Sequence, residues 1–201
     1  MAAEQIKWIY AIVHPLFSIG EVRKDDRKLN AAERLFVKNR FDLFGRHILG
    51  FENEKNAIAV LIAPGSKIMQ NKELKNNYKR FIVFAKKKLG DRLAILPPSL
   101  GYFSVEADAG LSGVGKRGLS RFKFDRNVFI CAMGDHTGPG CVDTGAQNIK
   151  KLLEDAGSNC IVHIVKGASM QSGEITPALI NFRKWRKRSA NSPMVRPKKP
   201  H

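Results

Sequence analysis

Cysteine is scarce in this 201-residue sequence, which has three cysteines at wide spacing and no Cys-x-x-Cys pair. That number and spacing exclude a disulfide framework and a zinc site built from cysteines. The sequence also lacks any apolar run near the roughly 20 residues that span a bilayer. Its first residues, MAAEQIKWIYAIV, contain no small-residue cleavage site after a basic start. These absences predict a cytoplasmic protein with no membrane segment.

Acidic residues are few relative to basic ones, 18 against 35, which gives a formal net charge of +17. Residues 183–201 contain eight Lys and Arg residues and no acidic residue, and residues 1–182 are also basic overall. A charge of this sign attracts polyanions because their counterions are released on binding. RNA or DNA is therefore a predicted partner. The alternative is that the charge serves solubility or reflects a generally basic proteome.

Short apolar runs alternate with helical patterns along the chain. The predicted strands are 7–16, 56–64, 93–96, 127–133 and 160–165, and the predicted helices are 31–49, 73–91, 144–157 and 176–188. The residues predicted to cap them are Asn30, Gly90, and Asp143 or Thr144. Continuously apolar strands separated by helices are typical of a parallel sheet covered on both faces.

The predicted fold is therefore α/β, with a mostly parallel, Rossmann-like, doubly wound sheet of about five strands flanked by helices. It forms a single domain over residues 1–188, and residues 189–201 form a disordered basic tail. Residues 99–120 contain five glycines and one short strand candidate, YFSVEA at 102–107.

The segment GDHTGPGC, residues 134–141, follows the fourth predicted strand and leads into a helix. Ligands of doubly wound folds bind beyond the carboxyl ends of the strands. His14 and residues 65–67 follow the first and second strands, so we expect all of these residues at one edge of the sheet.

This edge is predicted to carry catalysis. Cys141, close to a helix N-terminus, is the candidate nucleophile, with His136 or His14 as base and Asp135 as the residue that orients the base. Backbone amides around 140–142 would stabilise an oxyanion. The residues predicted to bind phosphate in the same region are Gly138, Gly140 and Thr144. The alternative is a simple strand-to-helix turn in which Asp and Thr act as caps.

A strand, a glycine, a short loop and Cys-Val at the start of a helix resemble the isochorismatase-like cysteine hydrolases. The matching features are Gly134, Cys141, Val142 and GAS at 167–169. The resemblance implies hydrolysis with Cys141 as nucleophile. The chain departs from the family in carrying His14 where the family has an aspartate, and in lacking an assignable lysine after the third strand.

The segment GLSGVGKR, residues 110–117, fits the phosphate-binding pattern G-x-x-x-x-G-K, but Arg117 replaces the Ser or Thr that would bind Mg²⁺. The following strand leaves no room for the long helix of an NTPase loop. Two interpretations of this segment remain: a mobile surface loop, or a loop that contacts phosphate without NTP hydrolysis. The residues of such a phosphate contact would be Gly113, Gly115, Lys116 and Arg117.

The segment FRKWRKR, residues 182–188, interleaves aromatic and basic residues and is a candidate nucleic-acid contact. Its basic residues are Arg183, Lys184, Arg186, Lys187 and Arg188. The histidine spacing predicts no metal site, and the sequence identifies no cofactor. Two functions remain open: a small hydrolase acting on a small-molecule substrate, and a non-catalytic RNA- or DNA-associated protein.

Overall fold

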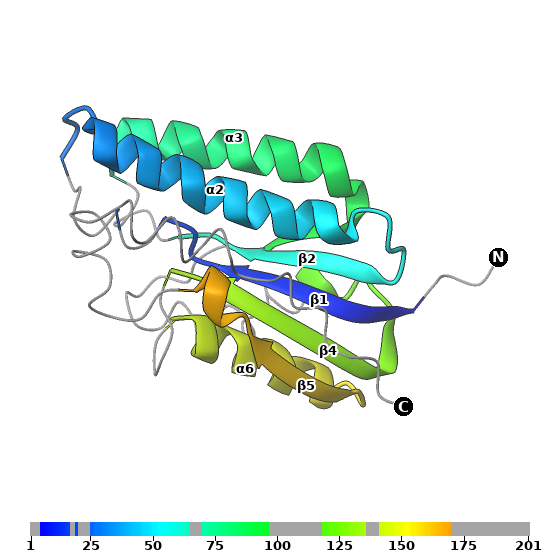
Figure 1. Cartoon of the computed structure of the whole chain (residues 1–201). Helices are drawn as coiled ribbons and strands as arrows, with labels where there is room; N and C mark the ends of the chain where they lie inside the picture. The colour runs from blue at the N-terminus through cyan, green and yellow to red at the C-terminus, as the bar shows by residue number, and fades with distance from the viewer. Residues whose placement is uncertain are drawn as a thin grey trace.

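A computed structural model describes residues 5–16, 19, 25–64, 70–96, 118–135 and 141–169 of the chain. The strands are β1 (Ile6–Val13), β2 (Ala57–Ile62), β3 (Leu93–Leu96), β4 (Phe124–Gly134) and β5 (Asn159–Ile164). The α-helices of the described residues are α2 (Ala31–Phe51), α3 (Lys72–Leu89) and α6 (Cys141–Glu154). Two short 3-10 helices, η1 (Gly90–Arg92) and η2 (Lys166–Ala168), follow α3 and β5 (Figure 1).

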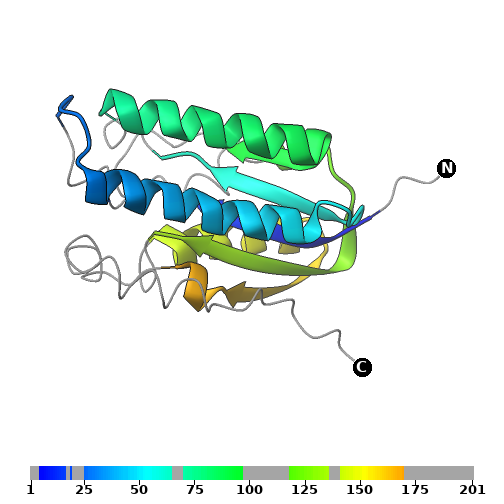
Figure 2. The ribbon, with the colours of Figure 1, turned by 45° about the horizontal axis from the view of Figure 1, so that its top comes forward.

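The strands form one five-stranded sheet in the order β3-β2-β1-β4-β5, and every pairing in it is parallel. The strand arrows accordingly share one direction beneath α2 and α3 (Figure 2). The chain moves outward from β1 to β2 and β3, then returns to place β4 on the other side of β1. The predicted α/β fold is confirmed. Its strand order reverses between β1 and β4, which is where doubly wound folds open their binding crevice.

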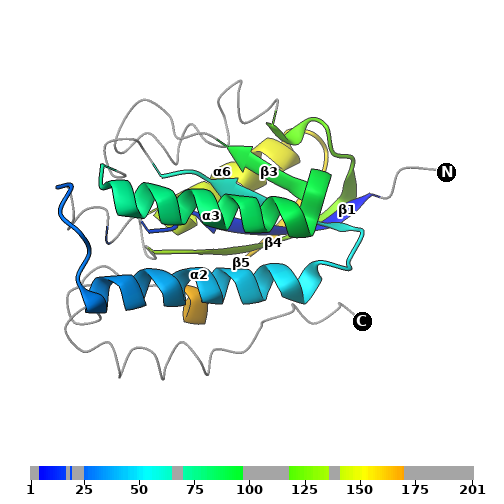
Figure 3. The same ribbon diagram turned by 90° about the horizontal axis from the view of Figure 1, so that it is seen from above.

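Helices cover both faces of the sheet. Figure 3 shows α2 and α3 in front of the strands and α6 behind them. Leu43, Phe44 and Phe81 of α2 and α3 pack in one core cluster with alternate residues of β1 and β2. Val142 and Ile149 of α6 belong to the cluster on the opposite face. Each central strand is therefore buried on both sides, which explains its continuously apolar sequence.

The ends of α2 and α3 follow local rules that the sequence reveals. Asn30 caps α2 in a capping box, with its side chain accepting from Glu33 N while the Glu33 side chain accepts from Asn30 N. Gly90 ends α3 with φ of 54°, a conformation that glycine adopts without strain. Both predicted caps are confirmed.

The predicted start of α6 is wrong. The helix begins at Cys141 rather than after Asp143 or Thr144, and both of these residues lie in its first turn. The reason is packing, because the apolar face of α6 already begins with Val142, followed by Ala146 and Ile149, all fully buried. β4 is also longer than predicted, since it begins at Phe124.

Three predicted features lie outside the described residues: the strand at 102–107, the helix at 176–188 and the tail at 189–201. No helix within the described ranges has the length and apolar character needed to cross a membrane.

Candidate functional site

The carboxyl ends of β1 and β4 place His14 and Asp135 side by side in the strand order. Val13 is the register partner of Gly134, so the residue that follows each strand lies at the same edge. His14 and Asp135 are both buried, with 1% of each residue exposed. Polar residues at this depth, at the point where the strand order reverses, mark a candidate functional site.

The backbone at His14 is unusual for a residue with a side chain. His14 has φ of 44° and Leu16 has φ of 69°, both in the left-handed region that favours glycine. The His14 N–H donates to Ile62 O at 3.0 Å, which ties this turn to the end of β2. Non-glycine residues in this region store strain of about 1–3 kcal/mol and concentrate at functional sites.

Gly134 allows the ends of β1 and β4 to approach closely. A Cβ at this position would lie 2.2 Å from Val13 O and 2.9 Å from Val142 Cγ2. The first contact is with backbone, which cannot rotate away, so only glycine fits here. The Gly134 N–H also donates to Ser169 Oγ at 3.3 Å, which connects β4 to the segment that follows η2.

A buried ion pair between Arg40 and Asp135 lies beneath this edge. Arg40 Nε donates to Asp135 Oδ1 at 2.7 Å, and Arg40 Nη2 lies 2.6 Å from the same oxygen. Nη2 also donates to Gly134 O and to Ala168 O, each at 3.0 Å. The two side chains are 1% and 0% exposed, and the guanidinium lies 4.6 Å from the centroid of the Phe44 ring. The carboxylate predicted to orient a base therefore also anchors α2 to the ends of β4 and η2.

Arg40 is a site residue that the sequence reasoning missed. Phe36, Arg40 and Phe44 are spaced four residues apart, which places Arg40 on the apolar face of the predicted helix. This spacing could have indicated that the arginine is buried. A buried arginine needs an anionic partner, and Asp135 is the acidic residue that directly follows β4.

Cys141 is the first residue of α6 rather than part of the preceding loop, which corrects its predicted place. It remains at the predicted edge, because α6 runs back from the carboxyl end of β4. A Cβ at Gly145 would lie 3.2 Å from Ile62 Cδ1 and 3.4 Å from Val13 side-chain atoms, so the N-terminal part of α6 rests against the ends of β1 and β2. Cys141 is buried, with 9% of the residue exposed, and it belongs to the core cluster on which α6 packs. Thr144 is half-buried in the first turn of the helix.

The other two cysteines are also buried, and they lie within strands, as predicted. Burial raises the pKa of Cys131 to about 12. Burial, followed by the nearby charge of Glu154, raises the pKa of Cys160 to about 11. Neither thiol ionises readily near neutral pH, so both serve as internal references for the reactivity of Cys141.

Several predicted site residues lie outside the described ranges. They are His136, Gly138 and Gly140 of the loop before α6, Gly113, Gly115, Lys116 and Arg117 of the glycine-rich segment, and Arg183, Lys184, Arg186, Lys187 and Arg188 of the basic segment. Residues 65–67 lie outside these ranges as well. Of the predicted catalytic set, the structure therefore brings His14, Asp135 and Cys141 to one edge of the sheet.

Comparison of the chain with protein-family models, with curated proteins and with solved structures finds no match. The resemblance to isochorismatase-like hydrolases therefore rests on the residues quoted above. In the described part of the chain, no group of three or more His, Cys, Asp or Glu side chains is placed to hold a metal ion.

Proposed function

We propose that this protein is a small enzyme with an α/β fold that catalyses hydrolysis, and that its site lies at the carboxyl edge of β1 and β4. The observation that carries the proposal is the strained backbone of His14, which stands where the strand order reverses. Strain of this kind persists only where the surrounding structure enforces it, and it concentrates at functional sites. Further support comes from Cys141, whose helix begins at the same edge.

In the proposed reaction Cys141 is the nucleophile. A histidine, His14 or His136, takes the thiol proton, and sulfur forms a bond to the carbonyl carbon of an ester or amide. The leaving alcohol or amine departs with that proton, which leaves a thioester on the enzyme. Water then attacks the thioester, releasing the carboxylic acid and restoring the thiol. The N–H groups in the first turn of α6 have no acceptors within the helix, and they would stabilise the oxyanion of both steps.

The Arg40–Asp135 pair has a positioning role in this proposal. Its hydrogen bonds join α2, the end of β4 and η2, so it fixes the walls of the site relative to one another. A reacting group displaced by an ångström loses much of the rate that orientation supplies.

The proposal is tested with p-nitrophenyl acetate as the acyl donor and the full-length protein. We expect a rapid burst of nitrophenol together with one acetyl group on the peptide that contains Cys141. The Cys141→Ser variant should retain the fold, because the change is nearly isosteric, and should show neither the burst nor the adduct. Cys160→Ser is the matched control and should behave as the unmodified protein does.

Two outcomes would refute the proposal. One is a burst of equal size in Cys141→Ser. The other is an acetyl group found on Cys131, on Cys160 or on lysines while Cys141 stays unmodified.

A further inference from the structure

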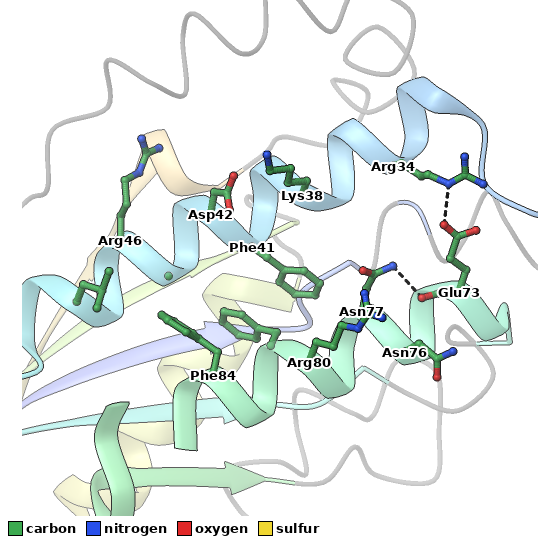
Figure 4. A pocket seen from close by; sticks show the side chains of 13 residues that line it. Arg34, Lys38, Phe41, Asp42, Arg46, Glu73, Asn76, Asn77, Arg80 and Phe84 are labelled. Carbon is green, nitrogen blue, oxygen red and sulfur yellow. Dashed lines mark hydrogen bonds and ion pairs between the residues drawn. The ribbon is translucent and has the colours of Figure 1, made fainter. Parts of the chain in front are cut away.

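A groove lies between α2 and α3, on the side of these helices that faces away from the sheet (Figure 4). Its volume is about 820 Å³, which is within the range of ligand sites. Its lining from α2 includes Lys38, Phe41, Gly45 and Arg46, and its lining from α3 includes Arg80 and Phe84. It is separate from the edge of the sheet that carries the proposed hydrolase site.

The floor of the groove is aromatic. The rings of Phe41 and Phe81 stack with centroids 4.7 Å apart, and the Phe84 ring lies 6.4 Å from that of Phe81. Figure 4 shows Phe41 directed from α2 toward α3 and Phe84 directed back toward α2. Phe41 and Phe84 are half-buried, so each ring keeps part of its surface open to the groove. Such surfaces can stack against the bases of a nucleic acid.

The lining of the groove has an excess of basic over acidic residues, with Arg34, Lys38, Arg46 and Arg80 against Asp42 and Glu73. Lys38 and Arg46 of α2 and Arg80 of α3 are exposed, and none of them forms an ion pair with another described residue. Arg34 is paired with Glu73 at 2.8 Å, and this hydrogen bond keeps the pKa of Glu73 below its usual value. The excess continues along α3, whose sequence contains seven Lys and Arg residues and one acidic residue. Cations on both rims suit an anionic backbone that runs along the groove.

Gly45 keeps the floor open. It lies in the interior of α2, where glycine costs about 1 kcal/mol of helix stability relative to alanine. A Cβ at this position would meet Phe84 ring atoms at 3.5 and 3.7 Å, which is ordinary van der Waals contact. Neither helix geometry nor packing therefore requires glycine here. Its effect is that no side chain of α2 covers the Phe84 ring at this position of the groove.

We propose that the α2–α3 groove binds single-stranded nucleic acid, with bases stacked on Phe41 and Phe84 and phosphates held by Lys38, Arg46 and Arg80. An acidic peptide would use the cations but would gain little from flat aromatic faces. A duplex would present phosphates while keeping its bases stacked away from the groove. The combination of an aromatic floor and basic rims therefore favours unpaired bases. The Asn76 and Asn77 side chains line the same groove.

The test measures fluorescence anisotropy of a labelled 12-nucleotide oligouridine with the full-length protein over a range of salt concentrations. The variant K38S/R46S/R80S removes three cations from the groove. Its control, K123S/K151S/K166S, removes three exposed lysines elsewhere, so the two variants have equal net charge. We expect the groove variant to bind at least about tenfold more weakly at low salt, with a log K against log salt slope reduced by about 2. The control should change Kd by less than about threefold.

Two further variants leave the net charge of the protein unchanged and alter the aromatic floor of the groove. Phe84→Leu retains an apolar side chain without a flat ring and should weaken oligouridine binding by about fivefold or more. Gly45→Leu should fill the floor and weaken binding similarly. Polyglutamate and a duplex of equal length serve as competitor ligands.

The proposal is overturned if the groove and control variants bind oligouridine equally, or if the unmodified protein does not bind it at low salt. It is also overturned if polyglutamate or duplex binds as tightly and Phe84→Leu has no effect, since that result would indicate a charge-only surface. The acylation of Cys141 should be the same in all groove variants, so failure here leaves the proposed hydrolase site unaffected.

Discussion

Arg40 and Arg80 are arginines on neighbouring helices, yet their surroundings are opposite. Arg40 is buried, bound to Asp135 and to two backbone carbonyls at the edge of the sheet. Arg80 is exposed on the rim of the α2–α3 groove and forms no ion pair within the described ranges. Charge at the sheet edge is compensated inside the protein and holds elements in place. Arg80 at the groove is exposed, so the same residue type holds elements together in one region and, in our proposal, binds a ligand in the other.

Breaking the Arg40–Asp135 pair should give the largest change in stability. Arg40→Met leaves the Asp135 carboxylate buried without its cation and should lower the free energy of unfolding by about 3–5 kcal/mol. Arg34→Met breaks an exposed pair with Glu73 and should cost less than about 1 kcal/mol. Denaturant unfolding measures both values. Equal stability of the two variants would contradict the difference proposed between the buried and the exposed ion pair.

A double variant separates loss of charge balance from loss of packing. Adding Asp135→Leu to Arg40→Met removes the uncompensated carboxylate and should recover at least half of the lost stability. If the double variant is less stable than Arg40→Met, the two side chains do not act as a pair.

His47 predicts how the stability of the folded protein depends on pH. It lies on the buried side of α2, where burial and then the charges of Arg46 and Arg40 lower its pKa from 6.5 to about 4. Between these values the unfolded chain binds more protons than the folded one, so stability falls as the pH drops from 6.5 to 4. The total loss is about 3 kcal/mol, at 1.36 kcal/mol per pKa unit.

The measurement is urea unfolding of the protein and of His47→Gln at pH 7, 5.5 and 4. The glutamine variant carries no titrating group at this position and should lose correspondingly less stability over the same range. Equal losses in the two proteins would show that His47 is not buried in its neutral form.

The strain at His14 predicts a smaller effect. Replacing His14 by glycine or by alanine removes the same ring, but only glycine adopts φ of 44° without steric cost. We therefore expect His14→Gly to be more stable than His14→Ala by about 1–2 kcal/mol. Thermal unfolding of the pair measures the difference. Alanine equal to or better than glycine would contradict the left-handed backbone at this residue.

The smallest effect is expected for the groove cations. The variant K38S/R46S/R80S should change the free energy of unfolding by no more than about 0.5 kcal/mol per residue, since exposed cations without partners contribute little to stability. Denaturant unfolding of this variant and of Arg40→Met measures the two free energies of unfolding for comparison. A loss approaching that of Arg40→Met would show that these side chains support the fold.

The sequence predicts those features of the fold that depend on local patterns. The Asn30 and Gly90 caps and the strand Leu93–Leu96 were predicted where they occur, because capping side chains, glycine and apolar runs act over a few residues. The position of His14 and Asp135 at the same edge followed from the parallel sheet. The start of α6 was missed because buried contacts of Val142 override the capping preference of Thr144.

Features that depend on distant contacts were not predicted. Arg40 and Asp135 are 95 residues apart, and nothing local to either residue indicates that they pair. The groove likewise requires two helices to lie side by side, with the Phe41 and Phe84 rings facing the same space (Figure 4). Amphipathic patterns show which side of a helix is buried, but they do not show which side chains meet across two helices.

The central claim is that the edge of β1 and β4 is a reactive site, and native alkylation of the three cysteines tests it most directly. The full-length protein is treated with iodoacetamide between pH 6 and 9, and peptide mass spectrometry measures the rate at each thiol. We predict that Cys141 reacts at least about tenfold faster than Cys131 and Cys160 at pH 7, with its half-maximal rate below about pH 8.5, the midpoint of an ordinary thiol. A Cys141 that reacts no faster than Cys131 until the protein unfolds would contradict the claim.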